Sequence, residues 1–232
     1  ISTFEAMKLD PVTKPIYTQM VDASGSPIIC HNVWISYFTG GRDKMGEGYG
    51  KLTAGYGSRG VPSELGEKIG PEFTFGIYAQ KALNEPILII KTAWGGKSIH
   101  TDFRPPSAGP YIFNEGELEN FRRRGKDLRE VKAEKAEQTG KFYGLMMDHV
   151  RKVLSDIKRV YPGYNVEKGY ELAGFVWFQG WNDMVASGTY PNRGQPGGYD
   201  AYTDCLAHFI RDVRKDLEAP KMKFVIGVMG VG

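Results

Sequence analysis

The order of apolar runs and helix-prone segments constrains the fold of this chain more than any other feature. Four short runs rich in Val, Ile and aromatic residues are typical of buried strands. They are Ile28–Phe38, Pro86–Trp94, Phe175–Phe178 and Met222–Met229. Helical spacing indicates three helices, Phe73–Leu83, Lys141–Tyr161 and Tyr199–Leu217. This alternation predicts right-handed crossovers and a mostly parallel α/β sheet with helices on both faces.

Length and charge exclude several classes of protein. The 232 residues are 41% hydrophobic, which is enough for one large domain or two small ones. We find no internal repeat and no second domain, so a single domain is predicted over residues 1–232. A net charge of +3 is too balanced to indicate nucleic acid or an anionic membrane as a partner. No apolar run approaches the roughly 20 residues of a membrane span. Cys30 and Cys205 are too few for a disulfide framework, although they are able to pair.

Two segments interrupt the regular pattern. Residues 39–70 are rich in glycine and predict a long irregular loop. They do not form a phosphate loop, because no Gly-Lys-Ser/Thr sequence follows a strand there. Residues 100–138 begin with a Pro-rich loop and continue as a charged, helix-prone stretch with little apolar face. Because acidic residues balance the basic ones, a solvated helix or lid is favoured over a binding patch for polyanions.

The strand at Phe175 leads directly into polar residues. Gln179, Gly180, Asn182 and Asp183 follow it, at the end of a strand where open α/β sheets place their sites. The amides of Gln179 and Asn182 donate hydrogen bonds without adding charge, which suits an oxyanion hole. The alternative is a simple turn, in which the Asn and Asp cap the next segment.

A second polar segment follows the strand at Pro86. Trp94 is followed by Gly95, Gly96, Lys97 and Ser98, and two glycines leave backbone N–H groups free to approach a ligand. A tight turn between strand and loop explains the same residues equally well.

Histidines and cysteines give little sign of catalytic or metal chemistry. His149 and His208 lie on or beside helix stripes and are interpreted as structural, whereas His100 follows the glycine pair and is able to reach a site. No Cys/His cluster indicates a metal, and no serine occupies a Gly-x-Ser-x-Gly elbow. The residues alone therefore provide oxyanion donors, no metal or other cofactor, and no nucleophile–base pair.

Taken together, these segments resemble the SGNH hydrolase superfamily, and in particular the sialate O-acetylesterase-like carbohydrate esterases. Gly180-Trp-Asn-Asp183 is similar to the Gly-x-Asn-Asp block, and Trp177-Phe-Gln-Gly180 to the Trp-x-Gln-Gly-Glu form of that block. Thr92–Ser98 is similar to the block whose glycine N–H joins the oxyanion hole. Gly70-Pro-Glu-Phe-Thr-Phe-Gly76 resembles a Gly-Pro-Glu segment that opens a helix in this branch.

The resemblance implies a fold, a reaction and a set of site residues. The fold is a three-layer α/β/α sandwich with a five-stranded, parallel, flavodoxin-like sheet. The reaction is removal of O-acetyl groups from an acetylated sugar or polysaccharide by a serine esterase without a metal. Gly95 or Gly96, with either Gln179 or Asn182, would hold the oxyanion. Substrate contacts are expected from Trp94, Lys97, His100 and Trp181.

Aromatic residues provide further candidates for sugar stacking, although packing in the core is the more common role of such residues. The candidates are Tyr49, Tyr56, Trp94, Phe103, Tyr111 and Trp181. We expect the glycine-rich loop and the charged 100–138 insertion to flank the cleft and to set specificity.

The chain departs from the family pattern in three places. The Gly-Gln-Ser-Asn block with the nucleophile and the Asp-x-x-His block with the base are absent, and Trp181 stands where the sialate branch has glutamate. We expect the missing blocks just upstream of Ile1 and beyond Gly232, and we expect this segment alone to be inactive. Secretion or a periplasmic location is typical of enzymes that act on polysaccharides. The alternative function is a non-catalytic carbohydrate-binding relative that has lost the triad.

Overall fold

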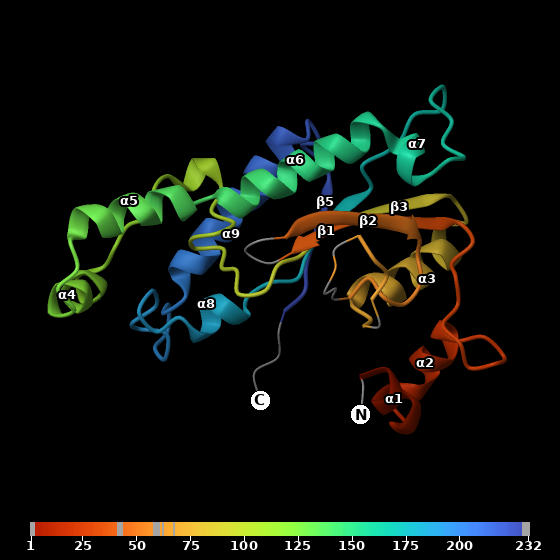
Figure 1. Cartoon of the computed structure of the whole chain (residues 1–232), viewed down its shortest axis with the longest axis horizontal. Coiled ribbons are helices and arrows are strands. Elements are labelled where there is room, and N and C mark those ends of the chain that lie inside the picture. The colour runs from red at the N-terminus through yellow and green to blue at the C-terminus, as the bar shows by residue number, and fades with distance from the viewer. Residues whose placement is uncertain (1–2, 41–43, 58–60, 62, 67, 229–232) are drawn as a thin grey trace. The chain divides into compact units, whose positions relative to one another are not determined.

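The computed structural model describes residues 3–40, 44–57, 61, 63–66 and 68–228, which divide into two compact units. The first unit comprises residues 1–95 and 149–166, and the second comprises residues 96–148 and 167–232. Both units contain strands and helices, which Figure 1 labels in chain order. The mixed α/β composition expected from the sequence is therefore confirmed.

A three-stranded sheet with the order β2-β1-β3 forms the centre of the first unit. The central strand β1 (Val33–Gly40) pairs in parallel with β3 (Ile87–Thr92), and Val33 lies opposite Ile87. On its other side β1 pairs antiparallel with β2 (Met45–Lys51), and Trp34 lies opposite Lys51. The strands predicted over 28–38 and 86–94 are confirmed at β1 and β3.

Strand β2 corrects the prediction of an irregular loop over residues 39–70. Glycine occupies every second position from Gly46 to Gly50, so the segment carries little β-propensity of its own. Pairing with β1 along seven residue positions provides the hydrogen bonds that its composition does not predict.

Alternate side chains of β1 point to opposite faces of this sheet. On one face, Val33, Ile35 and Tyr37 join the buried core that includes Phe73 and Ile77 of α3 (Pro71–Leu83). Pro71 opens α3, and Asn84 closes it in a left-handed conformation that donates its N–H to Gln80 O. The helix predicted at Phe73–Leu83 is therefore confirmed.

The opposite face of the sheet is covered by residues that follow His149. Phe38 stacks on His149 with a centroid separation of 5.1 Å, and Trp34 packs on Tyr161 at 4.0 Å. These residues belong to or follow α6 (Lys141–Ser155) and α7 (Ile157–Val160), which replace the single helix predicted at Lys141–Tyr161. Helices thus cover both faces of this sheet, as the sequence pattern predicts.

The first unit also contains two short helices, α1 (Thr3–Leu9) and α2 (Lys14–Met20), which the sequence analysis does not predict.

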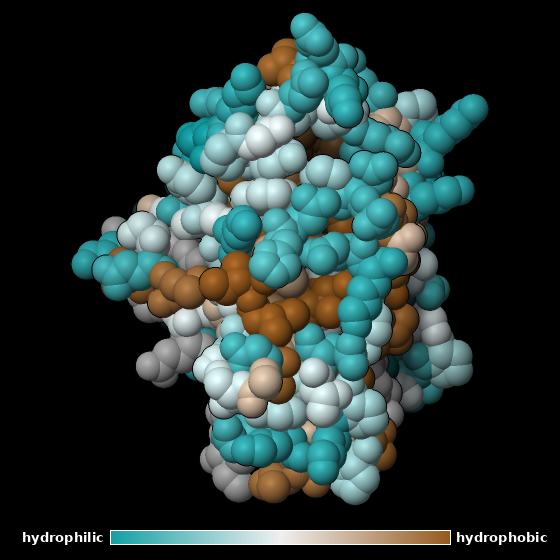
Figure 2. All heavy atoms as spheres, turned by 90° about the vertical axis from the view of Figure 1, so that its right-hand side faces the viewer, coloured by the Kyte–Doolittle hydropathy of each residue, from teal (hydrophilic) through white to brown (hydrophobic). Residues whose placement is uncertain are grey.

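Strand β3 forms the edge of the sheet opposite β2, and its residues Ile87, Leu88, Ile89 and Ile90 are half-buried. Figure 2 looks onto the side that carries β3 and α3 in Figure 1, and it shows apolar residues gathered there. On α3, the side chains of Phe75, Tyr78 and Leu83 are also exposed.

A pair of parallel strands and one long helix build the core of the second unit. Strand β4 (Gly174–Trp177) pairs with β5 (Lys223–Ile226), and Phe175 stacks on Phe224 at 4.9 Å. Helix α9 (Asp200–Asp216) places the fully buried Phe209 against Trp177, with ring centroids 4.4 Å apart. These elements confirm the strands predicted at Phe175 and Met222 and the helix predicted at Tyr199–Leu217. Met229 of the predicted last strand lies outside the described residues.

The charged insertion of the second unit folds into short helices. Pro106–Ala108 forms a 3-10 turn (η1), and α4 (Glu115–Arg123) and α5 (Leu128–Gln138) follow it. Asn114 and Glu117 form a reciprocal capping box at the start of α4, and Asp127 caps α5. No residue of α4 or α5 is fully buried, which agrees with the solvated helix expected from the sequence.

The single five-stranded parallel sheet is not formed by the described residues. They form a three-stranded sheet with one antiparallel pair, and a separate two-stranded parallel sheet. The difference arises because the glycine-rich β2 takes one edge of β1, and because β4 pairs with β5 alone.

Within the described ranges, every helix is too short or too polar to cross a membrane. Cys30 and Cys205 are both free thiols.

Candidate active site

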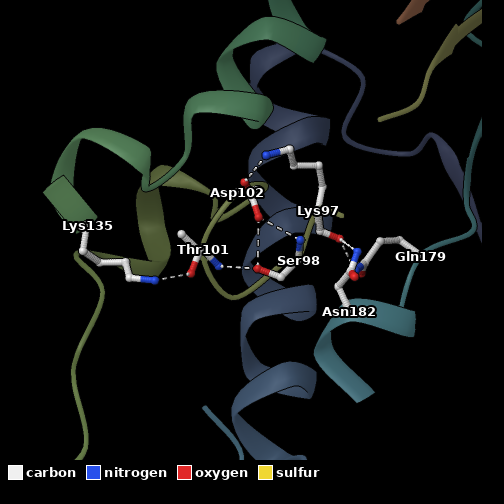
Figure 3. Close-up of polar contacts among 7 residues, drawn as sticks. All are labelled: Lys97, Ser98, Thr101, Asp102, Lys135, Gln179 and Asn182. Atoms are coloured by element: carbon white, nitrogen blue, oxygen red, sulfur yellow. Dashed lines mark hydrogen bonds and ion pairs between the residues drawn. The ribbon is translucent and has the colours of Figure 1, made fainter. Parts of the chain in front are cut away.

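The two polar segments predicted to share a site meet within the second unit, at the backbone carbonyl of Lys97. Gln179 Nε2 donates to Lys97 O at 3.0 Å, and Asn182 Nδ2 donates to the same oxygen at 3.1 Å (Figure 3). Gln179 follows β4, and Asn182 lies in the first turn of α8 (Trp181–Val185). Residues more than 80 positions apart in the chain are thus joined at one acceptor.

The carboxylate of Asp183 accepts hydrogen bonds from both polar segments. The carboxylate is almost completely buried, at 1% exposure, and accepts four hydrogen bonds. The donors are Ile99 N at 2.8 Å, His100 N at 3.2 Å, Gln179 Nε2 at 2.7 Å and Tyr190 Oη at 2.8 Å. Burial, followed by the charge of Asp183, raises the pKa of Tyr190, so this hydroxyl remains a donor. Asp183 therefore fixes the loop after Gly96, a role beyond the simple cap that the motif suggested.

The two candidate amides differ in what they have left to donate. Gln179 Nε2 uses both of its hydrogens, because it reaches both Lys97 O and Asp183. Both partners are pure acceptors, so the amide must point its nitrogen toward them. Asn182 Nδ2 makes one hydrogen bond, and its second hydrogen has no acceptor among the described residues. Asn182 thus retains a free donor that Gln179 lacks.

Gln179 is left with an unused acceptor instead. Its Oε1 is buried and has no hydrogen-bond partner in the described part of the chain. A buried acceptor without a partner costs about 1–3 kcal/mol, so such groups are rare without a reason.

The glycine pair provides space and backbone donors. Gly96 has a φ of +74°, in the left-handed region that favours glycine, and a Cβ there would meet no atom within 4 Å. Its N–H has no acceptor within the described ranges. Gly95 and Trp94 belong to the first unit, where Trp94 packs edge-on against Phe38 at 5.6 Å.

The loop from Lys97 to Asp102 is held by its own side chains (Figure 3). Asp102 accepts Ser98 N at 2.9 Å, Ser98 Oγ at 3.3 Å and Lys97 Nζ at 3.1 Å. The Lys97 ammonium also lies 4.1 Å from the Phe142 ring centroid. The charge of Lys97 is thus engaged within the loop in this structure, and so is the Ser98 hydroxyl.

His100 is packed between two tyrosine rings, Tyr111 at 5.0 Å and Tyr190 at 5.4 Å. Burial, with the positive charges of Arg104 and Lys135, lowers the pKa of His100 to about 4. The imidazole is therefore neutral at neutral pH. Its Nδ1 is buried and has no hydrogen-bond partner among the residues described.

The aromatic residues expected to stack on sugar divide into two groups. Tyr56 and Phe103 are buried in the cores of their units, at 4% and 6% exposure, so the stacking role does not hold for them. Trp181 is 62% exposed at the start of α8, and Tyr49 is 49% exposed on β2. Tyr111 is half-buried and lines a pocket in the second unit.

A buried Ser–His–Glu cluster in the first unit was not anticipated from the sequence. Ser36 Oγ lies 2.9 Å from His149 Nε2 and 2.7 Å from Glu47 Oε1. Because the carboxylate is only an acceptor, the Ser36 hydroxyl donates to Glu47 and His149 donates to Ser36. This polarity is the reverse of an activated serine, and Ser36 is fully buried. The cluster is structural, as the sequence analysis expected for His149.

Two basic residues neutralise the charge of Glu47 in this cluster. Lys152 Nζ and Arg159 Nη2 pair with Glu47 at 2.9 Å and 2.7 Å. Burial opposes ionisation of Glu47, but hydrogen bonds from Arg159, Lys152 and Ser36 outweigh it and hold its pKa at about 2. Burial lowers the pKa of His149 to about 4. Among the described residues, no group of acidic, Cys and His side chains is arranged to hold a metal ion.

Comparison with known proteins identifies the family. A family model described as "Carbohydrate esterase, sialic acid-specific acetylesterase" matches residues 58–232, which is most of the chain. The chain belongs to this family of carbohydrate esterases. The family match includes Gly96, Gln179, Asn182 and Asp183, and it confirms the resemblance drawn from the motifs.

Structural comparison adds a distant neighbour. A carbohydrate acetylesterase from Xanthomonas citri is similar with a TM-score of 0.44 and 13% sequence identity. The alignment covers 95% of this chain and 38% of that protein, so the chain spans well under half the length of its neighbour. No curated protein matches the chain.

Proposed function

We propose that these residues form part of a serine esterase that removes O-acetyl groups from a carbohydrate, as in the sialate O-acetylesterase-like branch. The single observation that best supports the proposal is the hydrogen bonding at Lys97 O, where Gln179 and Asn182 meet the loop that follows Gly96. Neutral N–H donors held rigidly at the end of a strand suit the negative charge that develops on an ester carbonyl oxygen.

Within this proposal, Asn182 donates to the oxyanion and Gln179 positions the site. Asn182 has one amide hydrogen left, and the N–H of Gly96 is a second donor within the same unit. Gln179 has no hydrogen left and ties Asp183 to the Lys97 carbonyl. The exposed Trp181 beside Asn182 is proposed to stack on the sugar ring. Lys97 and His100 are proposed to line the sugar site, with His100 neutral.

The proposal is tested by acetate release from acetylated sugars, using the protein as its gene encodes it. Substrates are 9-O-acetylated sialic acid and acetylated xylo-oligosaccharides. We expect Asn182→Ala to lower kcat by about 10²–10³-fold with little change in Tm, because one oxyanion donor is lost. We expect Gln179→Ala to lower Tm more than Asn182→Ala does and to lower kcat less.

Asn192→Ala provides the matched control, since Asn192 is an exposed asparagine of the same unit. It should leave both kcat and Tm unchanged. Binding of these sugars without release of acetate would overturn the esterase proposal and favour the non-catalytic relative. An equal loss of kcat in the Asn182 and Asn192 variants would overturn the assignment of Asn182.

A further inference from the structure

A serine and a histidine of the second unit form a direct hydrogen bond outside the site at Lys97 O. Ser107 Oγ, in the η1 turn, lies 2.7 Å from His208 Nδ1 on α9. Ser107 is exposed and His208 is half-buried, so the pair lies at the surface. The helical position of His208 predicts a structural role, but in the structure its Nδ1 faces the side chain of an exposed serine. A role in chemistry is therefore open to this pair.

The turn that carries Ser107 is held firmly against α9. The Ser107 N–H donates to Asp212 Oδ2 at 2.8 Å, and the Asp212 side chain is buried. Asp212 lies one helical turn after His208, so both partners of Ser107 come from the same face of α9. Arg104 Nη2 donates to Ala108 O at 2.9 Å and ties down the residue that follows the serine. The hydroxyl is thus already oriented toward the imidazole, which favours a reaction between them.

The polarity of the pair suits an activated serine. The Ser107 hydroxyl has no second hydrogen-bond partner among the described residues. When the neutral imidazole carries its proton on Nε2, Nδ1 is an acceptor and Ser107 donates to it. The buried Ser36 differs, because Ser36 donates to Glu47 and His149 is then the donor to Ser36. In Ser107 and His208 a base is placed to take the proton of a serine nucleophile.

The backbone N–H groups beside the serine limit what the pair is able to do. Ser107 N is engaged by Asp212, and Ala108 N donates to Pro105 O at 3.1 Å. Neither N–H is available to an oxyanion that develops on a substrate carbonyl. Such a pair is expected to react with activated esters, whose leaving groups depart readily, and to release the bound acyl group slowly.

We propose that Ser107 and His208 form a nucleophile–base pair that takes an acyl group from an activated ester, separately from the site at Lys97 O. Ser107 Oγ bonds to the ester carbonyl carbon while its proton passes to His208 Nδ1. The bond between that carbon and the leaving oxygen then breaks, and the leaving oxygen takes the proton from His208. The products are an O-acylated Ser107 and a free alcohol or phenol.

The test is mass spectrometry of the protein as its gene encodes it, after brief exposure to 4-nitrophenyl acetate and an acid quench. Peptide fragmentation should place one acetyl group on Ser107. His208→Gln should slow this acetylation by at least about tenfold, because a general base contributes about 10²–10⁴-fold to such a step. Ser107→Ala should leave position 107 without an acetyl group and no new site in its place.

The controls are an exposed serine of the same unit, Ser187, and an exposed histidine, His31. Ser187 has no histidine partner in the described structure, so its acetylation should be at least about tenfold slower than that of Ser107. His31→Gln should leave acetylation of Ser107 unchanged. Equal acetylation of the two serines, or equal rates in the wild type and His208→Gln, would overturn the pair. Because the acetyl group is located on Ser107 itself, neither result depends on acetate release from sugars.

Discussion

The two amides that follow β4 show how neighbouring residues of one chemical type make different hydrogen bonds. Gln179 and Asn182 are equivalent in sequence terms, since each is a neutral amide near a glycine. They differ in the number of hydrogen bonds that each amide nitrogen donates: Gln179 Nε2 donates two and Asn182 Nδ2 donates one. That count depends on the position of Asp183 and on the direction of the Lys97 carbonyl, neither of which the sequence specifies.

Asp183 provides the prediction that belongs to single residues. Asp183→Asn replaces an oxygen that accepts hydrogen bonds by an NH₂ group facing the same donors, so buried N–H groups lose their acceptor. We expect the free energy of unfolding to fall by about 2–3 kcal/mol. Urea denaturation followed by tryptophan fluorescence measures the change.

The control for Asp183→Asn is Asp204→Asn, an exposed aspartate on α9. This substitution should change the free energy of unfolding by no more than about 0.5 kcal/mol. If the two variants are equally stable, Asp183 does not hold the loop after Gly96.

At the scale of elements, α3 shows why a glycine occurs within a helix. Gly76 lies in the interior of α3, where glycine costs about 1 kcal/mol relative to alanine. A Cβ at this position would come within 2.1 Å of Leu52 Cδ2, and Leu52 is fully buried. The glycine therefore allows close packing of α3 against the sheet, which gives a physical reason for the last glycine of the Gly-Pro-Glu segment.

The same substitution should have opposite effects in two helices. Gly76→Ala is expected to destabilise the protein by about 1–3 kcal/mol, because the added methyl overpacks the core. Gly144→Ala in α6 is expected to stabilise it by about 0.5–1 kcal/mol, since a Cβ there meets no atom within 4 Å. Thermal denaturation of both variants measures the difference. Stabilisation by both substitutions would show that Leu52 moves aside without cost.

For the whole molecule, the sequence predicts the elements better than their assembly. The apolar runs correctly predict β1, β3, β4 and β5, because each is dominated by Val, Ile and aromatic residues. Strand β2 is missed because alternating glycines carry no β signal, and its pairing depends on a partner strand. The expected sheet of five parallel strands fails for the same reason, since composition does not determine which strand edges pair.

The polar clusters show the same limit: the sequence indicates the residues, but their contacts depend on how the elements assemble. Gln179 and Asn182 do meet Lys97 at its carbonyl oxygen, although the strands that precede the two segments, β3 and β4, lie in separate sheets. The Ser36–His149–Glu47 cluster has no motif, since its members meet only through the tertiary packing of the first unit.

Buried titratable groups in both units make the stability of the whole protein depend on pH. His149 and His100 each have a pKa of about 4, against an ordinary value of 6.5. Between pH 6.5 and 4 the unfolded chain binds protons at these histidines and the folded protein does not. Stability therefore falls as pH is lowered through this window, by up to about 1.4 kcal/mol per pH unit for each histidine.

The carboxylate of Glu47 acts in a lower window. Its pKa of about 2 in the folded protein lies below the ordinary 4.5, so its contribution is present above pH 4.5 and is lost as pH falls toward 2. During acidification, the stability that depends on the two neutral histidines is therefore lost first, between pH 6.5 and 4. The contribution of Glu47 is lost afterwards, as pH falls from 4.5 toward 2.

These windows are tested by urea denaturation at pH 7.5, 6.5, 5.5 and 4.5. The wild type should lose stability progressively below pH 6.5. In His149→Gln, whose amide is still able to donate to Ser36, the slope between pH 6.5 and 4.5 should decrease because one of the two titrating groups is gone. Combining it with His100→Asn should reduce the slope further. An unchanged slope in the double variant would mean that other groups govern acid unfolding, and that neither imidazole is held neutral by burial.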